Sequence, residues 1–152
     1  STAACAQTGT RRCAGRCGSR CCGTHRTTPA STGPRAVKLA AWNVNSLKVR
    51  LPQVLPWLEQ HQPDALCLQE TKLEDHNFPR AEIEAAGYHA VFSGQKTYNG
   101  VAILSRKPVD DVVAGIPGYA DPQKRMIAAT LDGVRVVCGY MPNGESVESD
   151  KY

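Results

Sequence analysis

The sequence predicts an α+β fold in which helices and strands alternate at first and strands then dominate. Two helices are predicted before residue 90, over residues 51–61 and 79–86, and they alternate with short apolar runs. Every later apolar run is short and is bounded on at least one side by Gly, Pro, Asn or Asp, which is typical of strands. Asp132-Gly133 joins the last two runs and is the clearest hairpin signal in the chain. This pattern favours a mixed sheet with antiparallel pairs over a purely parallel sheet.

The first predicted strand leads into the first predicted helix. Residues 37–43 form a short apolar run that ends in polar residues, which predicts a strand. Residues 51–61 predict a helix, because four apolar side chains share one helical face: Leu51, Val54, Leu55 and Leu58. Two prolines leave the start of this helix open. Either it begins near Pro52 and bends, or it begins only at Pro56, because a proline inside a helix removes a hydrogen bond.

The second predicted strand has a carboxylate at its end. Residues 65–69 form an apolar run typical of a buried strand, and Glu70 follows directly. Residues 79–86 predict a second helix, with proline at its start and Gly87 at its C-terminal cap. The remaining apolar runs predict strands over residues 88–92, 100–105, 109–114, 126–131 and 134–140.

Length and composition are those of one ordinary domain. The chain has 152 residues, of which 41% are hydrophobic and 21% charged, as in a typical globular protein. No apolar run approaches the roughly 18 residues that a membrane-spanning helix needs, so no membrane partner is expected.

The N-terminal stretch, residues 1–35, differs sharply from the rest of the chain. It contains no large apolar side chain, six of the 18 basic residues, none of the 14 acidic residues and five of the seven cysteines. Such a segment has almost nothing to bury against the entropy cost of ordering its backbone, so we expect it to be disordered. Residues 36–152 carry a net charge of −2, and their charge therefore gives no indication of nucleic-acid binding.

The cysteines of this stretch leave three interpretations open. Zinc binding is one, because Cys and His residues crowd together: Cys13, Cys17, Cys21, Cys22 and His25. Their spacing differs from that of the usual zinc motifs. A disulfide framework is the second, although intracellular disulfides are rare. The third, which the abrupt change of composition before Val37 favours, is that the stretch is not native protein and was read upstream of the true start.

Polar residues follow three of the predicted strands, at residues 42–45, 68–72 and 139–144. In layered α/β folds, ligands gather at strand ends because the sheet holds the loops there in place. Each residue also has an ordinary explanation. Asn43 could form a turn, Glu70 could be a solvated carboxylate and Tyr140 could be a plain strand residue. The sequence has no glycine-rich phosphate loop, no zinc-protease motif and no nucleophile elbow.

Four stretches together resemble a known family. They are Trp-Asn-Val-Asn-Ser-Leu-Lys-Val-Arg at 42–50, Leu-Gln-Glu-Thr-Lys at 68–72, Gly-Gln-Lys-Thr-Tyr-Asn-Gly-Val-Ala-Ile-Leu-Ser-Arg at 94–106 and Gly-Tyr-Met-Pro-Asn-Gly at 139–144. They resemble the exonuclease III family of apurinic/apyrimidinic endonucleases, within the endonuclease/exonuclease/phosphatase superfamily. The resemblance covers residues 37–152 and none of the N-terminal stretch.

The resemblance implies a set of site residues. Glu70 and Asn43 match metal-binding catalytic residues, with Mg²⁺ as the expected metal and Mn²⁺ as an alternative, and Tyr140 matches a catalytic tyrosine near the scissile phosphate. Asn45 stands where some relatives carry an acidic residue, and Lys72 is expected beside Glu70. The positions expected to contact the substrate are Asn143, Arg125, Tyr98, Lys72 and Asn45.

The resemblance also implies a fold and a partner. The family fold is a four-layer α/β sandwich, of which residues 36–152 would form about the first half, as the N-terminal half of a nuclease domain. The Gly-Asp-x-Asn and Ser-Asp-His elements of the family do not occur in this sequence. We therefore expect a fragment of a DNA-repair phosphodiesterase that is inactive by itself. The complete protein is expected to be a monomer in a bacterial-type cytoplasm that acts on double-stranded DNA at abasic sites and 3′ ends.

Two alternatives to this function stay open at this point. One is another phosphodiesterase of the superfamily, such as a phosphoinositide phosphatase or a sphingomyelinase, which the 94–106 stretch disfavours. The other is a noncatalytic fragment that binds nucleic acid loosely through its basic N-terminal stretch, with a steep dependence on salt.

Overall fold

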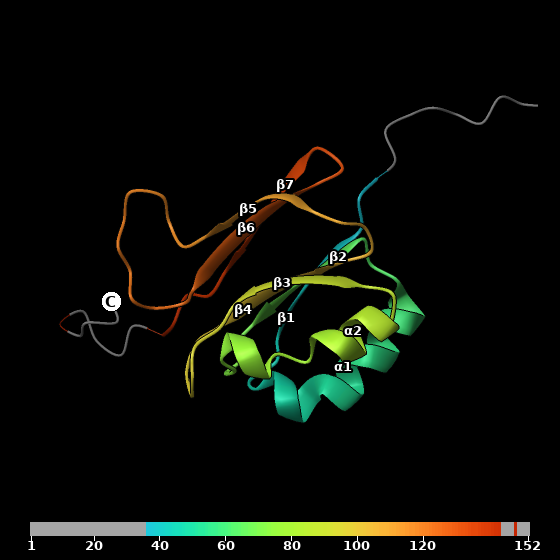
Figure 1. Ribbon diagram of the computed structural model, residues 1–152, viewed down its shortest axis with the longest axis horizontal. Coiled ribbons are helices and arrows are strands. Elements are labelled where there is room, and N and C mark those ends of the chain that lie inside the picture. Colours follow the sequence, from blue (N-terminus) through green and yellow to red (C-terminus); the bar gives the residue numbers. More distant parts are fainter. Residues whose placement is uncertain (1–35, 144–147, 149–152) are drawn as a thin grey trace, which may run out of the picture. The chain divides into compact units, whose positions relative to one another are not determined.

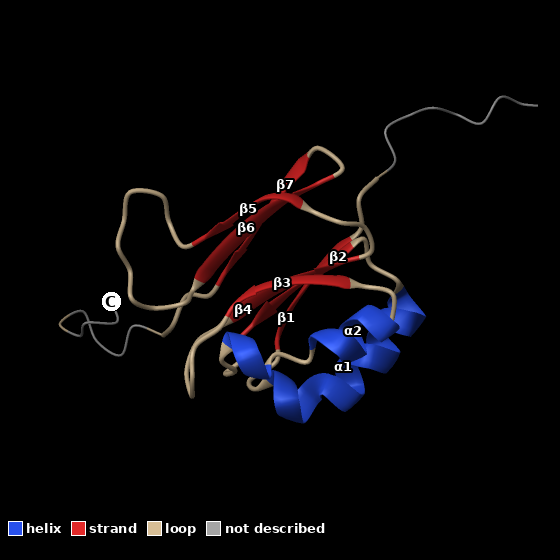
Figure 2. Cartoon of the chain, in the orientation of Figure 1, coloured by secondary structure: helices blue, strands red, loops and turns tan. Residues whose placement is uncertain are grey.

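Two β-sheets lie face to face in the structure, a computed structural model that describes residues 36–143 and residue 148 (Figure 1). Two helices cover the outer side of one of these sheets (Figure 2). The described residues thus form three layers in the order helices, sheet, sheet, which confirms the predicted α+β class and accounts for part of a four-layer sandwich. The expectations for residues 1–35 lie outside the described residues.

The first sheet is mixed and has the strand order β1-β2-β4-β3. Strand β1 (Leu39–Asn43) runs parallel to β2 (Ala65–Gln69), which pairs with β4 (Val101–Ser105) in antiparallel register. Strand β3 (His89–Ser93) pairs with the other edge of β4, also antiparallel. A mixed sheet with antiparallel pairs was the prediction, and it is confirmed.

The helices α1 (Leu47–His61) and α2 (Arg80–Ala85) pack against one face of this sheet, with the short 3₁₀ helix η1 (Asp75–Asn77) before α2. The buried residues of this helix–sheet core are Val44, Leu47, Val54, Leu58, Leu66, Leu68, Phe78, Ile83, Tyr88, Ala90, Ala102 and Leu104. Neither α-helix in the described part of the chain is long and apolar enough to cross a membrane.

The start of α1 differs from both predicted starts. The helix begins at Leu47 and continues through Pro52 and Pro56. These prolines are four residues apart and both exposed, while Val54 and Leu58 on the opposite side are fully buried. An interior proline costs a helix roughly 3 kcal/mol, whereas each buried Leu or Val side chain contributes about 1.5–3 kcal/mol. Burial against the sheet therefore outweighs the local preference that suggested a later start.

The second sheet contains β5 (Asp110–Ala114), β6 (Met126–Leu131) and β7 (Val134–Gly139), antiparallel and in that order. In the turn between β6 and β7, Asp132 has φ 48° and Gly133 has φ 80°. Two consecutive residues with positive φ are what a tight hairpin turn requires, and Asn or Asp followed by Gly adopts this conformation most readily. The predicted hairpin is therefore confirmed.

A second core lies between the sheets. Its buried residues are Ala65, Cys67, Val101, Ile103, Ile127, Ala129, Leu131, Val136 and Cys138. Near its β2–β7 side, the Cys138 thiol donates to the carbonyl of Leu68 at 3.4 Å and accepts from the Gln69 amide at 3.5 Å. A hydrogen bond with Cys67, followed by burial, raises the pKa of Cys138, so this thiol stays protonated. These contacts join the sheets directly beneath the end of β2.

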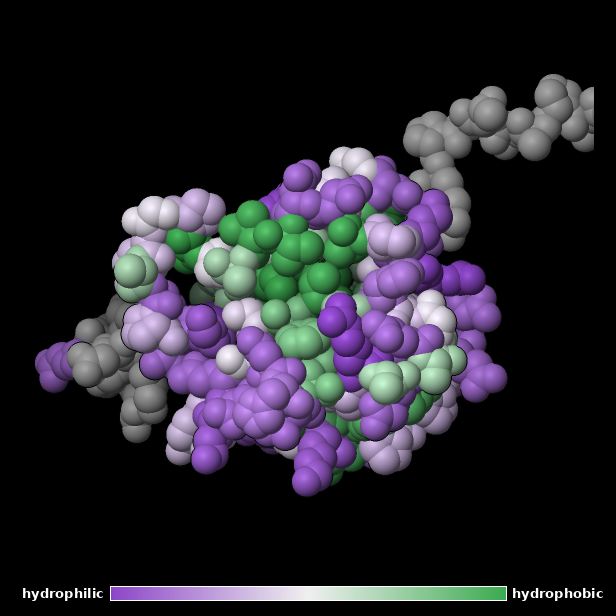
Figure 3. All heavy atoms as spheres, viewed as in Figure 1, coloured by the Kyte–Doolittle hydropathy of each residue, from purple (hydrophilic) through white to green (hydrophobic). Residues whose placement is uncertain are grey.

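The other face of the second sheet is uncovered within the described residues. Val137 is 57% exposed, although Val136 and Cys138 on either side of it are buried. Hydrophobic residues gather at the surface over β5 and β6 (Figure 3).

Candidate active site

The parallel pairing of β1 and β2 brings two polar strand ends together. Asn43 is in register with Gln69, so Glu70 follows at the same edge of the sheet. The Val44 amide donates to the Gln69 carbonyl at 3.0 Å, and the Ser46 amide donates to the Glu70 carbonyl at 2.8 Å. The loops that follow the two strands are thus tied to each other by their own backbones.

Four side chains at this edge form a hydrogen-bonded group, which we call the carboxylate cluster: Asn43, Asn45, Glu70 and Lys72. The Asn43 amide donates to Glu70 Oε1 at 2.8 Å, and Lys72 Nζ lies 3.3 Å from Glu70 Oε2. Lys72 Nζ also donates to Asn45 Oδ1, and the Asn45 backbone amide donates to Asn43 Oδ1 at 3.1 Å. Both oxygens of Glu70 are therefore held in fixed directions.

The surroundings of Glu70 favour its ionised form. The hydrogen bond from Asn43 is the largest cause that lowers the pKa of this carboxyl group. Partial burial opposes it, and hydrogen bonds from Tyr140 and Lys72, with the positive charge of Lys72, lower the pKa further. A carboxylate that accepts several hydrogen bonds loses that stabilisation when protonated. Glu70 is thus a permanent negative charge at neutral pH.

A cavity adjoins the carboxylate cluster through Tyr140. Its volume is about 670 Å³, and its lining residues are Gln95, Tyr98, Asn99, Gln123, Arg125, Tyr140, Pro142 and Asn143. We call it the Arg125 cavity. Tyr140 lines it and also hydrogen-bonds Glu70. All eight predicted site residues therefore lie either in the carboxylate cluster or in the lining of the Arg125 cavity. Tyr140 connects the two groups.

Backbone hydrogen bonds connect the loops that carry these residues. The amides of Thr71 and Lys72 donate to the carbonyls of Gly100 and Asn99, both at 3.1 Å. The Gly100 amide in turn donates to the Lys124 carbonyl at 2.9 Å. The loop after β2, the loop before β4 and the segment before β6 thus form one connected frame.

Gly100 lies where this frame is tightest. Its φ is +85°, and a Cβ atom added there would lie 2.2 Å from Oγ1 of the buried Thr71. Only glycine satisfies both conditions, because it tolerates positive φ and has no Cβ.

Four residues that line the cavity had no predicted role: Gln95, Asn99, Gln123 and Pro142. Gln95 and Asn99 fall inside the 94–106 stretch that carried the resemblance, but Gln123 lies in a polar segment without a pattern. Arg125 has a buried Nε without a hydrogen-bond partner among the described residues. Nε has almost no exposed surface, so Arg125 lines the cavity through its other atoms.

The donor set of the carboxylate cluster suits a hard divalent cation. Glu70 contributes a carboxylate and the asparagines contribute amide oxygens. The described residues contain no group of three or more His, Cys, Asp or Glu side chains placed to hold a metal. A cation that retains several water molecules and needs one or two carboxylates fits this arrangement better than zinc does.

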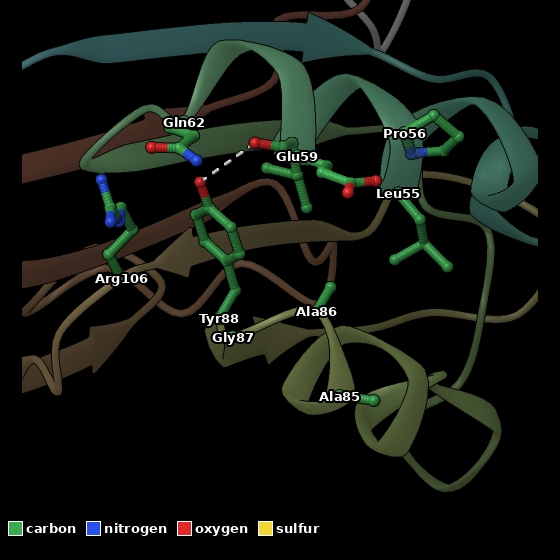
Figure 4. Close-up of a pocket in the computed structure, with 10 residues that line it drawn as sticks. Leu55, Pro56, Glu59, Gln62, Ala85, Ala86, Gly87, Tyr88 and Arg106 are labelled. Carbon is green, nitrogen blue, oxygen red and sulfur yellow. Dashed lines mark hydrogen bonds between the residues drawn. The ribbon is translucent and has the colours of Figure 1, made fainter.

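A second cavity of about 530 Å³ lies at the opposite end of the first sheet, where Arg106 follows β4 (Figure 4). The hydroxyl of Tyr88 points toward the end of α1 (Figure 4). It donates to the carbonyls of Pro63 at 3.2 Å and Leu58 at 3.5 Å. None of the predicted site residues lines this cavity. Its polar contacts anchor the end of α1.

Comparison with known proteins defines the class to which this fold and site belong. The pattern of the Endonuclease/Exonuclease/phosphatase family matches residues 40–148. The chain belongs to this family.

Individual relatives narrow the resemblance to DNA-processing enzymes. Exodeoxyribonuclease III of Haemophilus influenzae is 38% identical over 115 residues, which are 72% of this chain and 43% of the relative. The solved structure of the 3′ phosphatase NExo from Neisseria, bound to a product DNA hairpin, is 55% identical with a TM-score of 0.74, over 76% of this chain and 46% of that one. An AP endonuclease from Archaeoglobus fulgidus is 44% identical with a TM-score of 0.73, over 76% and 45%.

The chain thus spans less than half the length of these relatives. Their fold agrees with the expected sandwich, of which this chain accounts for one part.

Proposed function

We propose that this chain is part of a metal-dependent DNA-repair phosphodiesterase of the exonuclease III type, which acts on double-stranded DNA at abasic sites and 3′ ends. The observation that carries the proposal is the ionised Glu70, fixed by Asn43 and Lys72 beside a cavity that contains Arg125. The named relatives support DNA as the substrate, since they are an exodeoxyribonuclease, an AP endonuclease and a 3′ phosphatase bound to DNA.

Glu70 and Asn43 are the residues that we assign to the metal, with Mg²⁺ first and Mn²⁺ as an alternative. Glu70 presents carboxylate oxygens, and Asn43 both orients Glu70 and offers its own amide oxygen. Bound there, Mg²⁺ would supply Lewis-acid stabilisation of negative charge on the phosphate and on the leaving oxygen. Lys72 balances the charge of Glu70 and is held in turn by Asn45.

The Arg125 cavity is the site that we assign to the DNA backbone. A guanidinium group pairs well with phosphate oxygens, and Arg125 is one of the residues that line the cavity. Tyr98 is 68% exposed and offers an aromatic face to a base or sugar. Asn143 adds an amide donor at the rim, and Tyr140 lies between the cavity and Glu70.

The chain by itself is proposed to bind DNA without cutting it. In the described part of the chain, no histidine and no second carboxylate is among the groups that interact with Glu70. Hydrolysis of a phosphodiester needs a group that activates the attacking water as well as one that stabilises charge. We assign that group to the part of the family fold that residues 36–152 do not form.

The decisive experiment compares Glu70→Gln with wild type in a version extended to the family's full length. We expect incision of a duplex with an abasic site to fall by about a hundredfold or more, the scale on which one charge-stabilising group acts. Raised Mg²⁺ should recover part of the loss. Glu59→Gln is the matched control, because Glu59 lies at the second cavity, at the far end of the first sheet.

Near-wild-type incision by the Glu70→Gln variant would show that Glu70 is an ordinary surface carboxylate. Hydrolysis of phosphoinositides or sphingomyelin in preference to abasic DNA would assign the chain to another branch of the family. Lesion-specific incision by the 152-residue chain alone would contradict its proposed incompleteness.

The same proposal extends to the oligomeric state and the cellular location of the complete protein. We infer that the complete protein acts as a monomer in a bacterial-type cytoplasm, where chromosomal DNA is available. Support comes from the bacterial relatives, such as the exodeoxyribonuclease III of Haemophilus influenzae. Size measurement of the full-length version at micromolar concentration tests the monomer.

A further inference from the structure

Three side-chain amides form a hydrogen-bonded group at the floor of the Arg125 cavity. The Asn99 amide nitrogen donates to Gln95 Oε1 at 3.1 Å and also to Gln123 Oε1. Gln95 Oε1 accepts a further hydrogen bond from the Lys124 backbone amide at 3.2 Å. Asn99 thereby joins Gln95, in its own loop, to Gln123, in the segment before β6.

The orientation of these amides is set by the backbone. The Lys124 N–H group can only donate, so Gln95 must turn its oxygen toward it. The group on residue 99 that faces this oxygen must then be a donor. The asparagine side chain has two N–H hydrogens on one nitrogen, so it can donate to the Oε1 atoms of Gln95 and Gln123 at the same time. Its length suits the distance to both oxygens.

The backbone at this position also favours asparagine. Asn99 has φ 53°, a left-handed conformation that Asn adopts more readily than most residues. Its carbonyl accepts from the Lys72 amide at 3.1 Å, which connects it to the loop that carries Glu70. Asn99 therefore contacts the loop after β2 through its backbone and the segment before β6 through its side chain.

The position of Arg125 depends on this segment. Its Nε is buried without a hydrogen-bond partner among the described residues, so no hydrogen bond at Nε holds the side chain in place. The Arg125 amide donates to the Gln123 carbonyl at 3.1 Å, and its carbonyl accepts from the Tyr140 amide at 2.8 Å. The backbone position from which the Arg125 side chain extends is consequently set by the segment that Gln123 and Asn99 hold.

We propose that Asn99 is a positioning residue for DNA binding. Its side-chain amide joins the loop of Tyr98 to the segment of Arg125, so that both side chains line one cavity beside Tyr140. This inference rests on the proposed function, because it takes the cavity to be the DNA site. Asn99 acts through Arg125 and Tyr98 and needs no contact of its own with the DNA.

The test uses the 152-residue chain and a fluorescent duplex that carries a tetrahydrofuran abasic-site analogue, with affinity measured by anisotropy. Asn99→Gly removes the amide while keeping the positive φ accessible. Thr97→Gly is the matched control, because Thr97 lies in the same loop at φ 71° and its side chain has no hydrogen bond with the described residues. We expect Asn99→Gly to weaken binding about three- to tenfold, and Thr97→Gly to change it less than about twofold.

A double-mutant cycle separates positioning from general loop stability. If Asn99 acts through Arg125, the effect of Asn99→Gly should shrink to less than about twofold in an Arg125→Ala background. An undiminished effect in that background would overturn the proposal, as would wild-type affinity of the Asn99→Gly variant. Thermal unfolding of every variant shows whether each is fully folded at the temperature at which its DNA affinity is measured.

Failure of the proposed function gives a different result from failure of this inference. If the wild-type chain does not bind the duplex, the proposed function of the cavity fails, and hydrogen exchange then decides the role of Asn99. The Lys124 amide donates to the Gln95 oxygen that Asn99 holds. Its exchange should accelerate about tenfold in Asn99→Gly and stay unchanged in Thr97→Gly. Unchanged exchange in Asn99→Gly would refute the positioning role without reference to DNA.

Discussion

The two sheets of this molecule differ in how completely they are covered. In the first sheet, β4 is buried along its whole length and β2 over its first four residues, because helices lie on one face and the second sheet on the other. In the second sheet, buried and more exposed residues alternate along β6 and over most of β7. The sequence does not show this contrast, because β6 and β7 are nearly as apolar as β2 and β4.

The contrast teaches how the candidate site is supported. Glu70 and Asn43 extend from strands of the first sheet, and the backbone hydrogen bonds between their loops hold them. Arg125 and Tyr140 extend from the half-covered sheet, and side-chain amides such as that of Asn99 help to fix their loops. The residues proposed to hold the metal thus follow the first sheet, and the residues proposed to contact DNA follow the sheet with an open face.

The open face agrees with the length of the relatives. The chain covers 46% of the NExo chain and 45% of the archaeal AP endonuclease, so more than half of each lies outside the match. The edge strand β1 is also partly open, with Leu39 50% exposed, whereas its neighbour β2 is buried. Both open surfaces fit a domain whose remaining part supplies further cover.

The largest effect on stability is expected from truncation inside the covered sheet. Leu68 is fully buried between β2 and the helices. Leu68→Ala should lower the free energy of unfolding by about 2–5 kcal/mol, since it removes buried methyl groups and leaves a cavity. Urea unfolding followed by circular dichroism measures this change. A loss below about 1 kcal/mol would mean that the first sheet is no better packed than the second.

Gly100→Ala is expected to lower the free energy of unfolding somewhat less than Leu68→Ala does. It acts on the connected loops that carry the candidate site residues. The new Cβ would meet the Thr71 hydroxyl oxygen at 2.2 Å and would also sit at a φ of +85°. Together the two effects should cost about 2–4 kcal/mol in unfolding free energy. Gly118→Ala is the matched control, because Gly118 has φ +80° and open space around it, so it carries only the conformational cost of about 1–2 kcal/mol. Equal losses in the two variants would exclude a role for the Thr71 contact.

Much of this architecture was predictable from local patterns. Every predicted strand forms within about two residues of its predicted ends, and Asp132-Gly133 makes the predicted turn. The start of α1 was not predictable, because the tertiary burial of Val54 and Leu58 overrides the local effect of two prolines.

The candidate site divides in the same way. Asn43 and Glu70 lie together because β1 and β2 are parallel and end at the same edge of the sheet. A sequence pattern can suggest this, since both residues stand at the end of an apolar run. The partnership of Asn99 with Gln123 joins residues 24 positions apart across two irregular loops. No periodicity marks such a contact, so it becomes visible only in the structure.

A pH titration should reveal a smaller effect on stability, caused by Glu70, the proposed metal ligand. The pKa of Glu70 is lowered in the folded protein, chiefly by the Asn43 hydrogen bond, so its ionised form contributes stability above the ordinary carboxyl pKa of about 4.3. That contribution is lost as the pH falls through the lowered folded-state pKa. The wild type should therefore lose more stability than Glu70→Gln between neutral and acidic pH, as measured by urea unfolding at several pH values. Parallel curves for the two proteins would show that the hydrogen bonds to Glu70 add nothing to stability.

The smallest effect on stability is expected at the open face, where Val136 and Val137 allow a direct test of the comparison. These neighbours on β7 point to opposite faces: Val136 is 5% exposed in the core between the sheets, and Val137 is 57% exposed. Val136→Thr places a hydroxyl group in an apolar core and should cost about 1–3 kcal/mol. Val137→Thr makes the same chemical change in solvent, so its effect on the unfolding free energy should stay within about 0.5 kcal/mol.

Because exposed apolar residues promote association between molecules, Val137→Thr should instead reduce self-association, as measured by light scattering over a concentration series. Equal destabilisation by both substitutions would mean that the outer face of the second sheet is covered in solution, and the contrast between the two sheets would then be lost.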